Sequence, residues 1–403
     1  MVYSLYRLYI HVFGGFPFMK EKETEGRIKF MHVSDVHLDT PVIGMTPEKS
    51  DERGRDIRTA FMKLMEFVRS EEADFVLISG DLFDVDFVTN TTAEILIREF
   101  SNCPASEFII APGRYDHYKN NPIYASGRLP INCHVFSTST LDRFDFPEKN
   151  VTIYGWAFEE ESLTVNPLYD RSVDDISKIN IVCGYADLDG AVDSERCPIS
   201  KEERGKFGAD YYALGSRHER TDYTEIDASL YSYPGALESI GFDEHGIGAV
   251  NRFAVGYKKG EISIGTKKSA VFGHLEFKTE TVDVTGISQR GEIVNRISRL
   301  ISDKKYGQDT ALRIVLVGDV DPRFIIQSHL ESDAFGLYFF EMIDKTMPLY
   351  GTERLLRDMT SAGEIYRRLL PMMQSENEEE RLIGARAFRV GLAALEGRDA
   401  DII

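Results

Sequence analysis

A short apolar run followed by a turn rich in aspartate, histidine and glycine recurs along this chain of 403 residues, and this repeat constrains the fold more than any other feature. The apolar runs cover residues 28–33, 74–79, 108–112, 179–183 and 211–214. Between the first two runs, apolar side chains recur at helical spacing at Ile57, Ala60, Phe61, Leu64, Met65 and Val68. Buried strands that alternate with amphipathic helices are typical of α/β sheet sandwiches.

The turns that follow these runs hold residue types that can bind a metal. They read Ser34-Asp35-Val36-His37, Gly80-Asp81-Leu82-Phe83-Asp84, Gly113-Arg114-Tyr115-Asp116-His117, Gly184-Tyr185 and Gly215-Ser216-Arg217-His218. In open α/β sheets, the loops at the carboxyl ends of the strands form the binding site. We therefore expect these polar turns to converge on one site.

The chain is acidic, with 66 acidic against 47 basic side chains and a formal net charge of −19. This charge opposes long-range attraction to nucleic acid or to an anionic membrane. A DNA partner must therefore be held by a local basic patch or by a metal.

The sequence predicts a cytoplasmic protein. No run of about 18 apolar residues is present to span a membrane. The four cysteines show no CxxC spacing, and we expect free thiols in a reducing compartment. These cysteines are Cys103, Cys133, Cys183 and Cys197.

Residues 1–26 differ from the rest of the chain. This segment is rich in aromatic residues but has no small-residue cleavage site, so a signal peptide is disfavoured. Two interpretations stay open. Translation begins at Met19 and the residues before it are not native, or the segment is a short amphipathic arm that docks on the body.

In order and spacing, the polar turns resemble the motifs of the calcineurin-like metallophosphoesterases, and within them the SbcD/YhaO-type DNA repair exonucleases. The family order is DxHL, GDLFD, GNHD, an isolated histidine and GHxH. The matching segments here are SDVHLD, SGDLFD, PGRYDHY, CGYADLDG and ALGSRHER. Further similarity after residue 233 and near the chain end extends the resemblance to about residues 27–398.

The resemblance implies a four-layer α/β/β/α metallophosphoesterase sandwich over residues 27–255, followed by a small α+β capping domain over residues 256–350. Within the capping domain, residues 280–285 and 312–317 are expected strands. A helical tail would follow over residues 351–403, with capping boxes that start at Ser361 and Ser375. The tail either packs on its own domain or docks an SbcC- or YhaN-like ATPase partner.

The resemblance also implies two divalent cations, usually manganese, that share one carboxylate. Carried over to this chain, the ligands of the first cation are Asp35, His37, the shared Asp81 and His218. Two carboxylates with two imidazoles suit manganese, with iron or zinc as alternatives.

The ligands of the second cation are replaced. The three family positions hold Arg114, Tyr185 and Ser216, and the position of the catalytic histidine holds Tyr115. An arginine has no lone pair to donate, and a hydroxyl is a weak ligand unless it is deprotonated. We therefore expect one bound cation and no second one. We also expect the Arg114 guanidinium to occupy the vacated place and pair with Asp81, with the two tyrosines and Ser216 filling the rest.

Three interpretations of this half-intact site stay open. In the first, the protein is a family member with weak or no nuclease activity, and it acts on DNA as an interaction subunit with an ATPase partner. The second is an active manganese-dependent DNA phosphodiesterase that uses one metal and the charge of Arg114. The third is a site rebuilt from neighbouring residues, which would be Asp84, Asp116, His117, Asp187 and Asp189. A homodimer is also left open.

Overall fold

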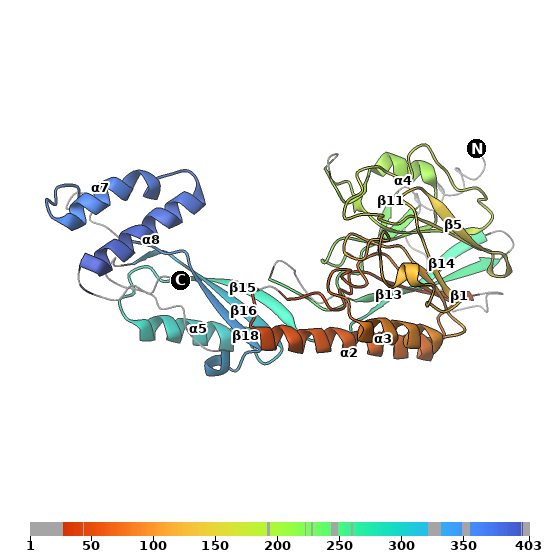
Figure 1. The fold of residues 1–403 in the computed structure, drawn as a ribbon, viewed down its shortest axis with the longest axis horizontal. Coiled ribbons are helices and arrows are strands. Elements are labelled where there is room, and N and C mark those ends of the chain that lie inside the picture. Colours follow the sequence, from red (N-terminus) through yellow and green to blue (C-terminus); the bar gives the residue numbers. More distant parts are fainter. Residues whose placement is uncertain are drawn as a thin grey trace, which may run out of the picture. The chain divides into compact units, whose positions relative to one another are not determined.

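The computed structural model describes residues 27–395 and 397, apart from residues 43, 192–193, 222, 227–228, 243–248, 259–260, 321–331 and 349–354. The leader predicted over residues 1–26 lies outside the described residues. The chain divides into two compact units, Met1–His274 and Leu275–Ile403 (Figure 1). Each unit is described by itself.

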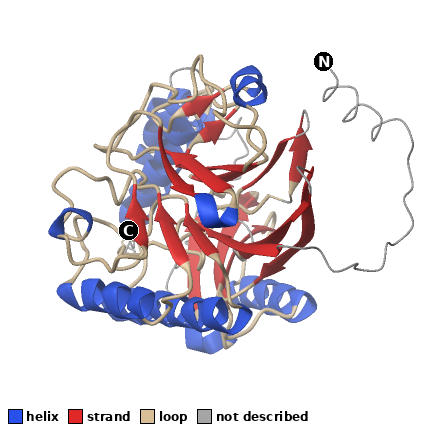
Figure 2. Ribbon diagram, turned by 90° about the vertical axis from the view of Figure 1, so that its right-hand side faces the viewer, coloured by secondary structure: helices blue, strands red, loops and turns tan. Residues whose placement is uncertain are grey.

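The described residues of the first unit form two six-stranded sheets and three α-helices (Figure 2). The first sheet has the order β14-β13-β1-β2-β3-β4, and the second has the order β11-β12-β10-β7-β6-β5. The elements are β1 (Arg27–Val33), α2 (Pro47–Glu71), β2 (Phe75–Ile78), α3 (Asn90–Ser101), β3 (Glu107–Ile110), η1 (Tyr124–Ser126), β4 (Cys133–Val135), β5 (Asp142–Phe146), η2 (Pro147–Lys149), β6 (Val151–Gly155), β7 (Ile179–Tyr185), β8 (Asp187–Leu188), β9 (Pro198–Ile199), α4 (Lys201–Phe207), β10 (Tyr211–Gly215), β11 (Thr224–Ile226), β12 (Ser229–Ser232), β13 (Val250–Lys258) and β14 (Glu261–Ala270). The mixed α/β class that the sequence predicts is confirmed.

Side chains of alternate residues on each strand point to opposite faces of the sheet, and this places the core. In β1, Met31 and Val33 pack in one cluster with buried residues of α2 and α3. The neighbouring Phe30 packs in another cluster, together with Ile181 of β7 and Ala213 of β10, so this core lies between the two sheets. A third cluster joins the opposite face of the second sheet to Phe207 of α4.

Helix α2 buries the apolar face that the sequence predicts, namely Ile57, Ala60, Phe61, Leu64, Met65 and Val68. Its start is fixed by Thr46, whose side chain accepts the backbone N–H of Lys49, and by Pro47 in the first turn. Parallel pairing of β1 with β2 and of β2 with β3 then brings the ends of these strands to one edge of the sheet.

The second unit contains a three-stranded parallel sheet in the order β15-β16-β18, flanked by α5 and followed by the helical pair α7 and α8. Ile293, Ile297 and Ile301 of α5 are buried in one cluster with residues of this sheet. The elements are β15 (Glu276–Asp283), α5 (Arg290–Lys304), β16 (Thr310–Val317), β17 (Asp319–Val320), η3 (Ser332–Phe335), β18 (Phe339–Asp344), β19 (Met347–Pro348), α7 (Ser361–Met373) and α8 (Glu378–Leu395). No helix in the described part of the chain is long and apolar enough to cross a membrane.

The structure differs from the sequence-based boundaries in two places. The boundary at residue 255 falls inside β13, and β14 pairs with β13 as far as Ala270, so the first sheet continues beyond it. The expected division at residues 350 and 351 separates elements that share the second unit, because Arg389 of α8 donates to the Asp344 carboxylate and to the Thr346 carbonyl.

Both capping boxes predicted in the tail are wrong. The N-cap of α7 is Thr360 rather than Ser361, and it makes no side-chain capping bond. At α8, the Asn377 side chain accepts the N–H groups of Glu379 and Glu380, because it lies closer to the helix start than Ser375. The first unit does contain a capping box, between Ser200 and Glu203 of α4.

His32 is a buried polar link between the two sheets of the first unit. Its Nδ1 lies 2.9 Å from the Tyr211 hydroxyl of β10, and its Nε2 lies 2.8 Å from the Ser79 hydroxyl. Burial lowers the pKa of His32 to about 3, against a smaller raising effect from the Leu214 backbone. The imidazole is therefore neutral in the folded protein at neutral pH.

The stability of the fold should decline with acid because of His32. The unfolded histidine binds a proton near pH 6.5, whereas the folded one does so near pH 3. Between these values the unfolded state holds more protons, so the free energy of unfolding should fall by up to about 1.4 kcal/mol per pH unit as pH decreases. In urea titrations between about pH 4 and pH 6, His32→Asn should show a shallower pH slope than the wild type. An unchanged slope would contradict this assignment.

Candidate metal centre

The turns after β1 and β2 are bonded to each other through their backbones. The N–H of Asp35 donates to the Gly80 carbonyl at 3.0 Å, and the N–H groups of Val36 and His37 donate to the Asp81 carbonyl at 2.9 and 3.0 Å. This arrangement places Asp35, His37 and Asp81 in the left-handed region, with φ of 50°, 53° and 55°. Such backbone strain is concentrated at functional sites, where the surrounding structure holds it in place.

Asp35, His37 and His218 form a compact group of ligand atoms. One ligand atom from each lies within 4.8 Å of the others. The Nε2 atoms of the two histidines are 3.1 Å apart, and His218 Nε2 lies 3.6 Å from Asp35 Oδ1. The structure thus brings together three of the four residues that the sequence predicts for the first cation.

The protonation state of His37 suits a metal ligand. Burial lowers the pKa of His37 well below its usual value, and the charge of His218 lowers it further. The imidazole is therefore neutral and has a lone pair to donate, which metal binding requires. Two imidazoles and a carboxylate at these separations fit a divalent transition metal.

Asp81, the fourth predicted ligand, lies beside this group rather than inside it. Its Oδ1 accepts the backbone N–H of Tyr115 at 2.7 Å, and its buried Oδ2 has no well-formed hydrogen bond. Burial raises the pKa of Asp81 well above its usual value, and the charges of Asp116 and Asp35 raise it further. The hydrogen bonds from Tyr115 and the Tyr185 phenol act in the opposite direction. This carboxylate therefore has a buried oxygen and excess negative charge around it, and both would favour a nearby cation.

The Tyr185 ring fills the space around Asp81 on the side of the replaced ligands. The side chain is 2% exposed. A Cβ added at Gly80 would lie 2.4 Å from the Tyr185 ring, and one at Gly113 would lie 2.7 Å from it. The two glycines thus leave the room that this ring occupies.

The expected pair between Arg114 and Asp81 is wrong. Within the described part of the chain, the ion pair of Arg114 is with Glu195, at 3.7 Å between Nη2 and Oε2. The arginine side chain is 32% exposed and that of Glu195 is 60% exposed. The Tyr115 amide already donates to Asp81 Oδ1, and the Tyr185 ring occupies the space beside Gly80 and Gly113.

Tyr115 and Ser216 also differ from the packing that we expected from the sequence. The Tyr115 side chain is 43% exposed, and its ring packs edge-on against His37, with ring centroids 5.2 Å apart. Ser216 is buried and has a φ of 102°. Its hydroxyl donates to the Ala186 carbonyl at 2.9 Å instead of facing Asp81.

Asp116 stabilises the backbone of the centre. Its carboxylate accepts the N–H groups of Asp81, Leu82 and Gly113 at 2.9, 3.0 and 2.6 Å, and also the Tyr124 hydroxyl at 2.6 Å. The sequence analysis did not predict this role, because the N–H groups of Asp81 and Leu82 come from a turn more than 30 residues away in the chain.

A site rebuilt from the neighbouring acids and histidine receives no support from the described residues. Asp116 is saturated by these donors, Asp187 accepts from Arg217 at 3.0 Å, and Asp84 accepts the N–H of Asp86. Among the described residues, the one group of at least three acidic, histidine or cysteine side chains that could hold a metal is Asp35, His37 and His218. Its members do not include His117 or Asp189.

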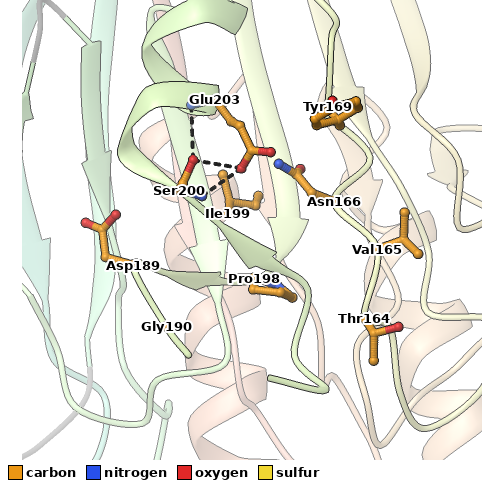
Figure 3. A pocket seen from close by; sticks show the side chains of 10 residues that line it. All are labelled: Thr164, Val165, Asn166, Tyr169, Asp189, Gly190, Pro198, Ile199, Ser200 and Glu203. Atoms are coloured by element: carbon orange, nitrogen blue, oxygen red, sulfur yellow. Dashed lines mark hydrogen bonds between the residues drawn. The ribbon is translucent and has the colours of Figure 1, made fainter. Parts of the chain in front are cut away.

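Asp189 instead borders a separate cavity of about 550 Å³ in the segment between β6 and β10 (Figure 3). On one wall, the Glu203 carboxylate accepts the Ser200 hydroxyl at 2.8 Å. The lining residues are Thr164, Val165, Asn166, Tyr169, Asp189, Gly190, Pro198, Ile199, Ser200 and Glu203. None of the predicted metal ligands borders this cavity.

Part of the chain matches a known protein family. A family model for the calcineurin-like phosphoesterases matches residues 28–215, which include Asp35, His37 and Asp81. The uncharacterized metallophosphoesterase YhaO of Bacillus subtilis (strain 168) is 26% identical over 314 residues, which cover 75% of this chain and 74% of YhaO.

More distant similarities were also found. The DNA double-strand break repair protein Mre11 of Methanopyrus kandleri is 24% identical over 306 residues, which cover 70% of this chain and 65% of that protein. The match therefore spans slightly less than two thirds of this Mre11 relative. The crystal structure of TT1561 of Thermus thermophilus aligns with a TM-score of 0.36 and 11% identity, over 59% of this chain and 98% of that chain.

We expect the purified protein to hold one divalent ion per chain. After dialysis against Mn²⁺, elemental analysis should give at most one tightly bound ion, because one set of ligands is assembled and the other is replaced. His218→Ala should abolish it, since it removes an imidazole from the three-residue group. Ser216→Ala is the matched control and should retain the ion, because its hydroxyl bonds to the Ala186 carbonyl. Two ions at near-full occupancy would contradict this stoichiometry.

The Tyr185 phenol, rather than Arg114, should contribute to stability next to Asp81. In the metal-free protein, Tyr185→Phe should lower the free energy of unfolding by about 1–3 kcal/mol, because a buried carboxylate loses a nearby donor. Arg114→Asn should change it by less than about 1 kcal/mol, because its ion pair is long and exposed. Urea denaturation of both variants measures the difference. A larger loss for Arg114→Asn would show that the guanidinium is the group that compensates Asp81.

Proposed function

We propose that this chain, which carries a calcineurin-like phosphoesterase domain over residues 28–215, is a member of the SbcD/YhaO-type DNA repair exonuclease family. We also propose that its own nuclease activity is weak or absent. In this proposal it acts on DNA as an interaction subunit with an ATPase partner. The similarity to YhaO and to the Mre11 repair protein supports the assignment to this group.

The asymmetry of the centre is the observation that carries the proposal. Asp35, His37 and His218 face one another as a ligand set, whereas Tyr185 packs beside Asp81 where a second cation would need ligands. A bound divalent cation would polarise a phosphoryl oxygen and lower the pKa of a bound water. The described residues offer no second imidazole pair there, and the exposed phenol of Tyr115 stands in place of the catalytic histidine.

Manganese is the cation that we propose for this site, with iron or zinc as alternatives. The neutral His37, a second imidazole and the Asp35 carboxylate provide nitrogen and oxygen ligands of the kind that these metals share. Asp81 completes the proposed set, because its buried Oδ2 has no well-formed hydrogen bond that a metal would need to displace.

An active one-metal phosphodiesterase is the second candidate. One observation favours it: among the described residues, the Arg114 guanidinium forms one ion pair, an exposed contact of 3.7 Å to Glu195. Arginine is permanently charged and stabilises the negative charge that develops in phosphoryl transfer. In this alternative, Arg114 would turn from Glu195 toward a bound phosphate.

The partner surface that we propose is the helical pair α7 and α8 of the second unit. Tyr366, Met373, Phe388 and Leu392 form their own small core between the helices. Several large apolar side chains near or on this pair are nevertheless exposed, namely Leu356, Met359, Ile383 and Leu395. Exposed apolar residues on a helical pair suit the docking of a coiled-coil segment of an SbcC- or YhaN-like ATPase. Four free thiols fit a cytoplasmic setting for this complex.

Cleavage of single- and double-stranded DNA in Mn²⁺ distinguishes the two candidate functions. We expect the wild type to cleave no faster than His218→Ala, both alone and with an SbcC- or YhaN-like ATPase of the same organism. Cleavage that requires Mn²⁺ and is lost in His218→Ala would reject the proposal. A further loss in Arg114→Gln would then support the one-metal alternative.

A further inference from the structure

We infer that Arg114, Arg196 and Arg217 form an arginine rim beside the metal centre and bind the phosphodiester backbone of a nucleic-acid strand. This inference rests on the proposed function and adds the groups that would hold the strand. It also supplies one of the two features that the net charge of −19 calls for in a nucleic-acid-binding protein, which are a local basic patch or a metal.

Arg217 is the most firmly positioned member of the arginine rim. It directly precedes the metal-ligand candidate His218, and its guanidinium lies over the Tyr233 ring, 4.9 Å from the ring centroid. Its Nη2 donates to the Asp187 carboxylate at 3.0 Å and to the Leu188 carbonyl at 2.8 Å. The side chain is 44% exposed, and no other nitrogen of the guanidinium bonds to a described residue. A guanidinium has five N–H donors, so several stay available to a ligand.

Arg196 belongs to the same rim through the backbone. The N–H of Asp187 donates to the Arg196 carbonyl at 2.8 Å, so Arg196 lies next to the segment that holds Arg217. Its side chain is exposed and forms no ion pair or hydrogen bond with the residues described.

Arg114 reaches this rim from the turn after β3. Its guanidinium contacts Glu195, the residue before Arg196, at 3.7 Å. The three arginines thus come from three separate segments, which are linked by the pair between Arg114 and Glu195 and by the contacts of Asp187 with Arg196 and Arg217. The acidic ion-pair partners of these three arginines among the described residues are two, Glu195 and Asp187.

The chemistry of the rim selects a phosphate ligand. A guanidinium is planar, permanently charged and able to donate two parallel hydrogen bonds to phosphate oxygens. Three of them at the edge of a metal-ligand group would fix a strand with one phosphate near the centre.

Fluorescence anisotropy with a labelled single-stranded oligothymidylate tests this inference. The full chain is used with EDTA, so that neither a bound cation nor cleavage contributes. Each of Arg114→Gln, Arg196→Gln and Arg217→Gln should raise Kd by roughly 3- to 10-fold, and the triple variant by about 100-fold or more. The slope of log Kd against log salt should fall by about 0.7 for each arginine lost, as expected for single strands. Replacement by lysine should restore the slope but only part of the affinity.

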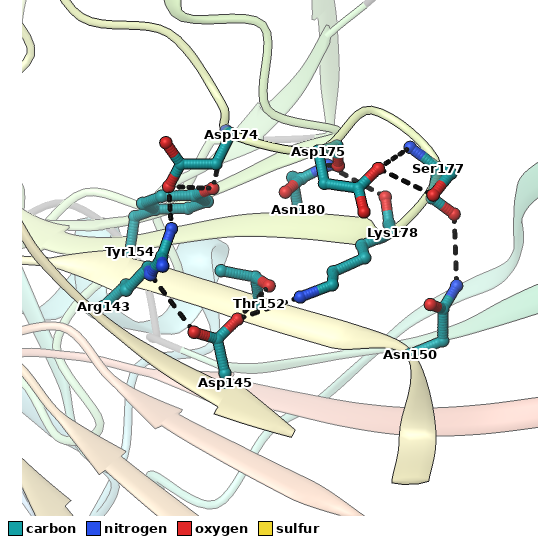
Figure 4. Close-up of polar contacts among 10 residues, drawn as sticks. All are labelled: Arg143, Asp145, Asn150, Thr152, Tyr154, Asp174, Asp175, Ser177, Lys178 and Asn180. Carbon is teal, nitrogen blue, oxygen red and sulfur yellow. Dashed lines mark hydrogen bonds and ion pairs between the residues drawn. The ribbon is translucent and has the colours of Figure 1, made fainter. Parts of the chain in front are cut away.

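Arg143→Gln is the matched control. Arg143 is 45% exposed, close to the 44% of Arg217, and it likewise has acidic partners, Asp145 and Asp174 (Figure 4). It lies on β5, the last strand of the second sheet, and should leave Kd unchanged. Thermal denaturation of each variant checks that the fold is retained.

The outcomes separate this inference from the proposed function. If the wild type binds the strand and the triple variant binds equally well, the arginine rim is wrong while a DNA function stands. An equal loss in Arg143→Gln would also reject the rim, since only overall charge would then matter. If the wild type does not bind the strand, the result rejects the proposed action on DNA. The inference of an arginine rim is then rejected as well, because it rests on that function.

Discussion

The carboxylate of Asp116 is the interaction on which the rest of the centre depends. It accepts backbone N–H groups from the turn after β2 and from the turn after β3, and so fixes the two turns to each other. The turn after β1 is bonded in the same way to the Asp81 carbonyl. Together these bonds hold Asp35, His37 and Asp81 in left-handed backbone conformations that the chain would otherwise avoid.

This backbone scaffold concentrates negative charge where water is excluded. Asp35, Asp81 and Asp116 are all fully buried, and an uncompensated buried carboxylate is costly. The pKa of Asp81 is raised because burial destabilises its charged form. A cation bound by Asp35, His37 and His218 would relieve it on one side. On the other side, the chain uses the Tyr115 amide and the Tyr185 phenol, which are neutral donors.

Replacing a cation by neutral donors changes what the centre can do. A neutral donor compensates a carboxylate in the ground state but cannot activate a water as a metal does. In our inference, the arginine rim is the group that holds an anionic strand. Our proposal of an interaction subunit with weak or no nuclease activity follows from this difference between a neutral donor and a metal.

The sequence by itself determined the strands, the helix faces and the positions of the polar turns, because these depend on local periodicity. The buried face of α2 and the bounds of β1 agree with the sequence pattern, and Asp35, His37 and His218 meet as the strand-end argument requires. Only the tertiary structure decided which side chains fill the space between these turns. Arg114 contacts Glu195, Tyr185 packs between Gly80 and Gly113, and Asp116 holds the backbone. The physical reason is that these contacts join residues from separate segments of the chain. The local sequence pattern does not determine which of several possible groups contacts a buried carboxylate.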